Sequence, residues 1–308
     1  MLESFLIVGT QVLILFIMIG LGFFGGRKKL ITQEGVRSIN DILLYFVTPC
    51  VIIHAFQRPF EKTMLNNLLL AMFASLISHI LCYLLGFLFV RSRDLAKRKV
   101  LRFTVAYSNC GFMALPLAEA LLGSEGVFYA AGYLAVFNIM VWSFGQYSMG
   151  KGQEGFSNIK AILNPGVLSV IVGLIFFFTS YTLPEIIGSP IAYLASLNTP
   201  LPMLIIGYTI SRLDFKQIVH LTSEWIALIL RLIVAPSILL VILYAMGYRG
   251  TLLMASIVSA STPVAAISVM FSIKFKVDET MASKLVAISS LFSVFTMTIV
   301  IGIAKYLA

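Results

Sequence analysis

Continuous apolar stretches of about 17 to 25 residues recur along the whole chain and constrain its fold more than any other feature. A helix rises 1.5 Å per residue, so each stretch is long enough to cross about 30 Å of hydrocarbon. The 308 residues are 59% hydrophobic and only 11% charged, which leaves little chain for a soluble domain. A membrane barrel would show alternating hydrophobicity instead. The sequence therefore predicts an all-α polytopic membrane protein.

The apolar stretches predict ten transmembrane helices. Their expected ranges are 4–24, 36–56, 66–90, 101–122, 126–149, 165–181, 190–211, 224–246, 250–271 and 282–306. Glu3 stands where a secretory signal would carry positive charge, so the first stretch is interpreted as a retained helix. The three cysteines lie inside apolar stretches without metal-ligand spacing. Neither a metal nor any other cofactor is predicted.

The basic residues predict how the chain is oriented in the cell membrane. If alternate loops share a side, one side carries Arg27, Lys28, Lys29, Arg37, Arg91, Arg93, Lys97, Arg98, Lys99, Arg102, Lys151, Lys160, Arg212, Lys216, Lys274, Lys276 and Lys284. The other side carries only Arg58, Lys62, Arg249 and Lys305. Because positively charged loops stay in the cytoplasm, both termini are expected outside it. This topology accounts for the net charge of +9, so no nucleic acid partner is predicted.

A weak internal repeat divides the chain into two halves. The sequence Phe46-Val-Thr48-Pro49 in the second stretch recurs as Leu197-Asn-Thr199-Pro200 in the seventh. Five crossings per half reverse the orientation of the second copy, an arrangement typical of alternating-access carriers. We therefore expect residues 1–155 to form one five-helix repeat and residues 156–308 a second, inverted repeat within a single membrane domain.

Helix-breaking residues lie near the middle of the fourth and ninth stretches. The fourth contains Gly111 and Pro116, and the ninth contains Pro263. Proline removes a backbone donor and glycine loosens the backbone, so each stretch can split into two half-helices. Irregular backbone at membrane depth is tolerated where it is buried in protein or lines a wet cavity. The sequence thus predicts that helices 4 and 9 are broken at a functional crossing.

The two breaks predict a binding site for an anion, because helix N-termini present positive dipole ends. Asn109 and Thr262 lie at the breaks, where they could donate hydrogen bonds to a carboxylate. The further candidate residues for substrate binding are Ser108, Cys110, Gly111, Ser261 and Pro263. The alternative is that serine, threonine and proline here serve only helix packing and kinking.

Other polar or rigid residues within the apolar stretches have less specific candidate roles. Pro49, Pro116 and Pro200 are expected to kink their helices and shape the cavity, although structural kinking alone is an equal alternative. Glu119 could accept a coupling proton or cation, or could simply be wetted at the outer mouth. Arg231 could pair with the substrate anion, or its stem could snorkel to the cytoplasmic interface.

The motif Ser108-Asn-Cys-Gly-Phe-Met-Ala-Leu-Pro116 in the fourth stretch and Ser261-Thr-Pro-Val264 in the ninth, together with the order of the stretches, resemble the auxin efflux carrier family. The resemblance covers essentially the whole chain. The chain lacks the long central loop of the plant members and in this respect resembles a prokaryotic member. It implies two inverted five-helix repeats, crossing broken helices 4 and 9, a scaffold and a transport domain, and a homodimer.

The same resemblance implies which residues bind the substrate. Asn109 matches the asparagine of the Asn-Pro pair that receives the carboxylate in the plant branch, but Cys110 replaces the proline. Pro263 matches the proline of the ninth helix. Prokaryotic members are associated with small carboxylates such as malonate, malate or oxalate.

These observations predict a secondary active transporter that moves a small organic anion, a mono- or dicarboxylate, across the lipid bilayer of the cell membrane by alternating access, with a proton or sodium as the coupling ion. A sodium-coupled carrier similar to bile acid symporters is the nearest alternative. An intramembrane enzyme would need two aspartates, a serine with a histidine, or a zinc motif within the stretches, and none is present. A channel would need a filter-like repeat, which is also absent from the sequence.

Overall fold

The computed structural model describes residues 2–150, 165–212 and 222–308, and within these ranges the chain is almost entirely helical. The helices are α1 (Leu2–Arg27), α2 (Gln33–Ile42), α3 (Thr48–Phe56), α4 (Lys62–Phe89), α5 (Leu95–Ala106), α6 (Leu115–Met140), α7 (Gln146–Gly150), α9 (Pro165–Thr179), α10 (Glu185–Ser196), α11 (Pro200–Ser211), α12 (Thr222–Ile229), α13 (Ala235–Ala245), α14 (Gly250–Ser261), α15 (Ile267–Lys274) and α16 (Glu279–Leu307). Short π-helical turns are η1 (Leu43–Val47), η2 (Cys110–Ala114), η3 (Val141–Gly145) and η5 (Leu230–Val234). The described residues form no β-strand, and their one β-bridge is isolated.

Each of the ten apolar stretches falls mainly on helical backbone. Six helical segments among the described residues are long and apolar enough to cross a membrane: Gln33–Phe56, Lys62–Phe89, Cys110–Gly150, Glu185–Ser211, Ser223–Ala245 and Glu279–Leu307. Shorter apolar helices cover Leu13–Arg27, Pro165–Thr179 and Gly250–Ser261. An all-α membrane protein is therefore confirmed, whereas ten crossings and an inverted repeat stay predictions. The expected boundary between residues 155 and 156 lies outside the described residues, as do Lys151, Lys160 and Lys216.

Gly123 separates the segments expected as the fourth and fifth spans. Its backbone has φ 66° and ψ −162°, a non-helical conformation inside α6 that side chains with a Cβ rarely adopt. The long helical run Cys110–Gly150 therefore bends between the two predicted ranges, 101–122 and 126–149.

Three of the π-helical turns end directly before a proline-containing first turn. Pro49 in α3, Pro116 in α6 and Pro236 in α13 each occupy the second residue of the helix that follows such a turn. Proline lacks the amide that would bond to the carbonyl four residues earlier, and a π-turn changes the local hydrogen-bond pattern. The sequence predicts kinks at Pro49 and Pro116, and it did not predict the π-helical turns that precede them.

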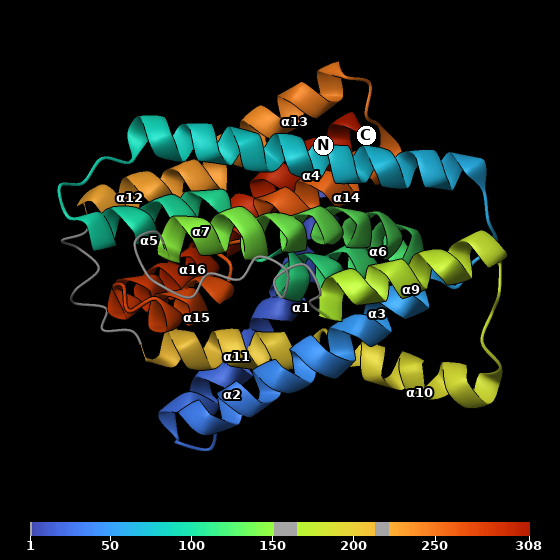
Figure 1. Ribbon diagram of the computed structural model, residues 1–308, viewed down its shortest axis with the longest axis horizontal. Coiled ribbons are helices and arrows are strands. Elements are labelled where there is room, and N and C mark those ends of the chain that lie inside the picture. The colour runs from blue at the N-terminus through green and yellow to red at the C-terminus, as the bar shows by residue number, and fades with distance from the viewer. Residues whose placement is uncertain (1, 151–164, 213–221) are drawn as a thin grey trace.

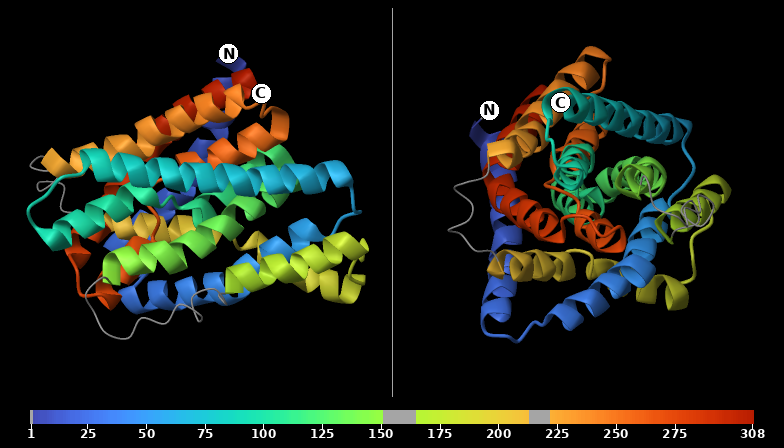
Figure 2. Two further views of the ribbon diagram at one scale, coloured as in Figure 1. Left: turned by 45° about the horizontal axis from the view of Figure 1, so that its top comes forward. Right: turned by 60° about the vertical axis from the view of Figure 1, so that its left-hand side comes forward.

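The helices gather into two groups. Figures 1 and 2 show α2, α3, α10 and α11 on the side of the molecule opposite α4 and α13. The first group is held together by packing of α1 on α11 and of α3 on α9 and α10. In the second group α14 packs against α4, α6, α13 and α16. The interrupted helices α5 and α14 thus lie within the second group.

The tightest contact in the first group joins two glycines. A Cβ atom added to Gly207 of α11 would overlap the carbonyl of Ile19 and lie 2.6 Å from the amide nitrogen of Phe23. A Cβ on Gly22 of α1 would likewise overlap the backbone of Leu204. Small residues let helix backbones approach closely, which is how membrane helices associate without a hydrophobic driving force.

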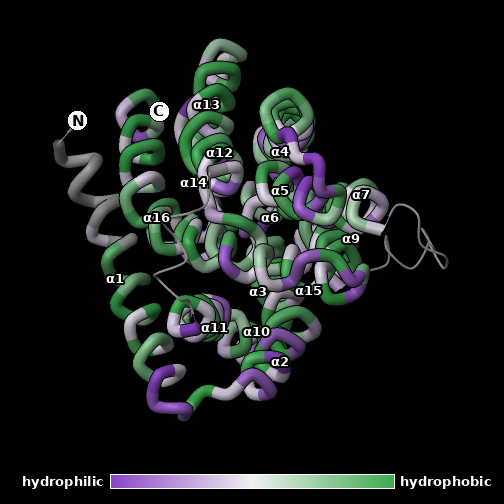
Figure 3. Tube along the Cα trace, turned by 90° about the vertical axis from the view of Figure 1, so that its left-hand side faces the viewer, coloured by the Kyte–Doolittle hydropathy of each residue, from purple (hydrophilic) through white to green (hydrophobic). Residues whose placement is uncertain are grey.

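Large apolar side chains remain exposed on the outer faces of the helices. Leu21, Phe87, Val241 and Phe295 are each more than three-fifths exposed. Figure 3 shows hydrophobic colour along α1, α13 and α16, with hydrophilic colour at the connection between α1 and α2. An apolar outer surface with polar ends is the surface that a bilayer solvates.

Candidate functional site

Both predicted breaks are interruptions of regular helix. α5 ends at Ala106, Tyr107 is extended with φ −121° and ψ 117°, and η2 begins at Cys110. α14 ends at Ser261, Thr262 is extended with φ −63° and ψ 153°, and α15 begins only at Ile267. Each interruption therefore leaves helix ends whose amides and carbonyls need partners from elsewhere.

The two interruptions pair with each other. The amide of Asn109 donates to the carbonyl of Pro263 over 2.8 Å, and the amide of Ala265 donates to the carbonyl of Tyr107 over 3.0 Å. Ser108 and Val264 lie opposite one another in this antiparallel bridge. The structure thus brings together Ser108 and Asn109 from one break and Thr262 and Pro263 from the other. We call this pairing, residues 107–109 with 263–265, the crossing.

Proline explains one break and the crossing itself explains the other. Pro263 has no amide to bond to the carbonyl of Ser259, and the hydroxyl of Thr262 donates to that carbonyl instead, over 3.0 Å. The first break has no proline at Cys110, yet its backbone leaves the helix at the same place. The hydrogen bonds of Tyr107 and Asn109 to the second segment replace helical bonds that the first segment gives up.

The polar side chains at the crossing are buried. Ser108 is 2% exposed, Asn109 5%, and Ser261 and Thr262 are fully buried. The hydroxyl of Ser261 has no hydrogen-bond partner among the described residues, and no hydrogen bond between described residues engages the side chain of Asn109. Because buried polar groups are normally hydrogen-bonded, these two side chains retain bonding capacity for a ligand or for water.

The neighbouring candidate residues occupy the helix that follows the first break. Cys110 is buried and Gly111 is half-buried. A Cβ atom added to Gly111 would lie 3.4 Å from the side chain of Leu134. Pro116 is buried in the first turn of α6. These residues continue from the crossing toward the bend at Gly123.

Pro49 and Pro200 begin helices of the first group. Each lies in the first turn of its helix, α3 or α11, and α11 contacts η2 beside the crossing. Two nearby polar atoms are buried without a partner among the described residues, the hydroxyl of Thr48 and the amide oxygen of Asn198. The two matched Thr-Pro pairs, at Pro49 and Pro200, therefore each have a buried polar group without a partner beside them.

Glu119 lies apart from these buried groups. Its side chain is exposed, on the part of α6 between Pro116 and Gly123. Arg58, in the loop before α4, is half-buried; its Nε donates to the carbonyl of Ala55 over 2.8 Å. Burial lowers the pKa of the Arg58 guanidinium, while the negative charges of Glu125 and Glu119 oppose that shift. Glu119 therefore lies on an exposed part of α6, near enough to Arg58 for their charges to interact.

Arg231 lies inside the protein, and its side chain does not extend to the membrane–water interface. The residue is 1% exposed, on η5, and its guanidinium donates to the carbonyl of Val105 over 3.2 Å and to the carbonyl of Ala260. Both carbonyls belong to the last turn before a break. Arg231 therefore contacts the two half-helix ends directly.

Ser289 is a residue at the crossing that the sequence did not single out. Its hydroxyl oxygen accepts a hydrogen bond from the amide of Val264 over 3.1 Å and donates to the carbonyl of Val286. The available signal was the run of hydroxyls Ser289, Ser290 and Ser293 on one apolar helix, α16, although such serines also serve ordinary helix packing.

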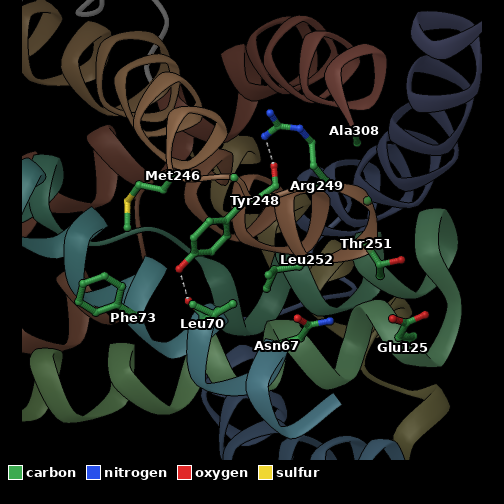
Figure 4. Close-up of a pocket in the computed structure, with 12 residues that line it drawn as sticks. Asn67, Leu70, Phe73, Glu125, Met246, Tyr248, Arg249, Thr251, Leu252 and Ala308 are labelled. Carbon is green, nitrogen blue, oxygen red and sulfur yellow. Dashed lines mark hydrogen bonds between the residues drawn. The ribbon is translucent and has the colours of Figure 1, made fainter. Parts of the chain in front are cut away.

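A separate cavity of about 670 Å³ lies near the chain's C-terminus (Figure 4). It is lined by Asn67, Leu70, Phe73, Glu125, Met246, Gly247, Tyr248, Arg249, Gly250, Thr251, Leu252 and Ala308. The hydroxyl of Tyr248 donates to the carbonyl of Leu70 over 2.9 Å across this cavity. None of the residues predicted to bind substrate lines it. We place the candidate site at the crossing because that is where buried, unpartnered polar groups meet broken helices.

Apolar helices that expose hydrophobic faces, with two broken helices paired at their centre, define a multi-pass membrane protein of the transporter class. A family profile described as "Membrane transport protein" matches residues 7–301. The chain belongs to this family, the auxin efflux carriers, as its motifs predicted.

Three relatives match over nearly their whole length. A protein of Methanothermobacter thermautotrophicus named as an uncharacterized transporter is 25% identical, over 92% of this chain and 93% of its own. A second uncharacterized transporter, from Methanocaldococcus jannaschii, is 25% identical over 92% and 94%. A Rhizobium meliloti protein named "Putative malonate transporter" is 24% identical over 93% and 92%. These relatives are transporters by name, which agrees with the expectation that the chain is not an enzyme and implies a small-molecule substrate.

Proposed function

We propose that the protein is a secondary active transporter that moves a small organic anion, a mono- or dicarboxylate, across the cell membrane by alternating access. The observation that carries the proposal is the pairing of the breaks at Asn109 and Pro263 by backbone hydrogen bonds. Broken helices that meet at membrane depth form the substrate sites of many secondary transporters.

The helix starts beside the crossing support an anionic substrate. η2 begins at Cys110 and continues into α6, and α15 begins at Ile267. The first amides of a helix lack internal acceptors and carry partial positive charge, so they stabilise a carboxylate. The name of the Rhizobium meliloti relative refers to malonate, a dicarboxylate, and agrees with that chemistry.

The proposed ligands are the side chain of Asn109 and the hydroxyl of Ser261, which have no partners among the described residues. The hydroxyls of Ser108 and Thr262 and the amides that follow Cys110 complete the proposed set. A buried carboxylate needs several donors to offset the loss of its hydration, and the crossing supplies both side-chain and backbone donors.

The proposed architecture is two inverted five-helix repeats in the cell membrane, with both termini outside the cytoplasm and two copies of the chain forming a homodimer. Matched features of the two halves support the repeat. Pro49 and Pro200 both lie in the first turn of a helix in the first group, and both interrupted helices, α5 and α14, belong to the second group.

A sodium-coupled carrier similar to bile acid symporters is not favoured, because the family match and the relatives identify a different transporter family. The same family assignment argues against an intramembrane enzyme and a channel. Coupling to a proton or to sodium is decided by the gradient that drives uptake.

The test is uptake into proteoliposomes of a panel of labelled mono- and dicarboxylates, with sodium, proton and voltage gradients imposed separately. We expect saturable uptake of at least one carboxylate. Asn109→Ala is expected to reduce it about 10- to 100-fold, since a hydrogen bond to a charged group contributes about 1.5–3 kcal/mol. Asn66→Ala, which removes an exposed amide near the N-terminal end of α4, is the control. Absence of uptake for every carboxylate would contradict the proposal.

A further inference from the structure

Arg231 carries a permanent charge in the protein interior without a carboxylate partner. Its side chain is 1% exposed, and among the described residues it takes part in no ion pair. A buried charge is stable only where other groups replace its hydration. The groups around this guanidinium therefore indicate what it does.

Those groups are the free ends of the two broken helices. One Nη donates to the carbonyl of Val105, in the last turn of α5, and the other to the carbonyl of Ala260, in the last turn of α14. The last carbonyls of a helix have no amide partner within it, and they carry partial negative charge. One guanidinium thus bridges two negative dipole ends from opposite halves of the chain.

A third contact fixes the same guanidinium to a different helix. The first Nη also lies 3.5 Å from Sγ of Cys82, on α4. Arg231 itself lies on the π-helical turn η5, directly before α13. π-turns are frequent at functional sites because they redirect a side chain that a regular helix would turn elsewhere.

We infer that Arg231 is a fixed cation that takes the place of a coupling sodium ion at the crossing. In transporters built on broken helices, half-helix C-terminal ends and unwound carbonyls coordinate the coupling cation. The guanidinium of Arg231 binds two such carbonyls and cannot dissociate, since it is covalently held. The inference rests on the proposed function and assigns Arg231 a positioning role: it holds the half-helix ends, and transport does not require sodium.

The first test measures thermal stability of the purified protein in detergent, with sodium, choline or millimolar guanidinium as the chloride salt at equal ionic strength. The wild-type Tm is expected to be the same in sodium and in choline. Arg231→Ala is expected to lower the Tm by about 3 to 10 °C, and guanidinium or sodium is expected to restore part of that loss. The matched control is Arg249→Ala, because Arg249 also donates to a helix-end carbonyl, that of Tyr244, and to the loop carbonyl of Tyr248, but away from the crossing. Its Tm is expected not to respond to these ions.

The second test measures uptake in proteoliposomes. Wild-type uptake is expected to be unchanged when choline replaces sodium. Arg231→Ala is expected to lose at least about tenfold in rate and to regain activity with guanidinium, and Arg231→Lys, which keeps the charge but not the fork of donors, is expected to lie between the two. Failure of guanidinium to restore any uptake in a folded Arg231→Ala protein would contradict the inference.

Sodium stabilisation of the wild-type protein, or sodium dependence of its uptake, would overturn the inference even if Arg231→Ala does not fold. A folded Arg231→Ala protein that responds to neither ion would overturn it as well. The stability arms need no transported substrate, so they stand if no carboxylate is carried. Sodium-dependent carboxylate uptake would, conversely, remove the role of Arg231 and leave the proposed function intact.

Discussion

The backbone amide of Asn109 donates a hydrogen bond to the carbonyl oxygen of Pro263 over 2.8 Å, which joins the interruption of one apolar helix to that of another. With the reciprocal bond from Ala265 to Tyr107, it forms an antiparallel bridge between the two breaks. Backbone groups freed from a helix in an apolar environment would otherwise each be destabilising by several kcal/mol. The crossing is therefore stable only while both helices stay broken at matching positions.

Replacing Pro263 is expected to affect transport according to the helix propensity of the new residue. Pro263→Ala supplies an amide for the carbonyl of Ser259, which the Thr262 hydroxyl now satisfies, and favours extension of α14 through the break. We expect uptake to fall about tenfold in Pro263→Ala, since a favourable helical bond of about 1–1.5 kcal/mol then competes with the crossing.

The matched variant for this comparison is Pro263→Gly. Glycine also restores the amide, but it disfavours helix by about 1 kcal/mol relative to alanine. Uptake by Pro263→Gly is therefore expected to exceed that of Pro263→Ala. Equal, wild-type rates in both variants would show that the break does not depend on this residue.

Removing the hydroxyl of Ser289 is expected to destabilise the crossing. The amide of Val264 loses its acceptor in Ser289→Ala, and an unsatisfied buried amide is destabilising by about 1–3 kcal/mol. We expect the Tm in detergent to fall by about 2 to 10 °C, at about 2–4 °C per kcal/mol, and uptake to fall with it. Ser290→Ala is the control, because the Ser290 hydroxyl donates only to the carbonyl of Val286 in its own helix. A Tm loss of equal size in both variants would contradict the assignment.

The contact between α1 and α11 is expected to tolerate no side chain at Gly207. A Cβ there would lie 2.6 Å from the amide nitrogen of Phe23, and helix backbones cannot move aside as a flexible side chain can. Gly207→Ala is expected to lower the free energy of unfolding by about 1–3 kcal/mol and the Tm by several degrees.

Gly20→Ala provides the comparison on α1. No atom lies within 4 Å of a Cβ at Gly20, and alanine is the better helix former, so the Tm is expected to stay equal or to rise. The Tm of both variants is measured by heating the purified protein and quantifying by chromatography the fraction that stays folded. Unchanged stability in Gly207→Ala would mean that α1 and α11 are less closely packed than described.

The two ends of α4 are expected to lie on opposite sides of the membrane. Lys62 begins this helix and Arg93 follows its end, and both side chains are exposed. Lys62→Cys is expected to react with a membrane-impermeant maleimide in intact cells, whereas Arg93→Cys is expected to react only after permeabilisation, as the positive-inside rule requires. The unmodified chain is the blank, with Cys82 and Cys110 buried and Cys50 half-buried. Labelling in the reverse order would invert the proposed orientation.

Much of the fold follows from local sequence. The apolar stretches are long because the bilayer is thick, so their positions could be read with errors of a few residues; the predicted range 66–90 corresponds to α4, Lys62–Phe89. Pro263 predicted its break for an equally local reason, the missing amide. The bend at Gly123 could not be predicted in this way, since a glycine between two apolar stretches does not by itself indicate a bend.

Cys110 shows where local reasoning stops. A helix interrupted without proline depends on bonds that its backbone makes elsewhere, and the partner, Pro263, lies in the other half of the sequence. The role of Ser289 could not be predicted for the same reason. A serine that accepts a hydrogen bond from a distant amide has the same local sequence as one that bonds within its own helix.

The sequence by itself determined that the chain is a helical membrane protein of the auxin efflux carrier family and that one of its helices would break at Pro263, because hydrophobic length and the chemistry of proline are properties of consecutive residues. It left Arg231 open between a substrate partner and a side chain at the interface. Only the tertiary structure directed that guanidinium to the carbonyls of Val105 and Ala260. The physical reason is that a buried charge is stabilised by whichever polar groups packing brings to it, and those groups come from helices far away in the sequence.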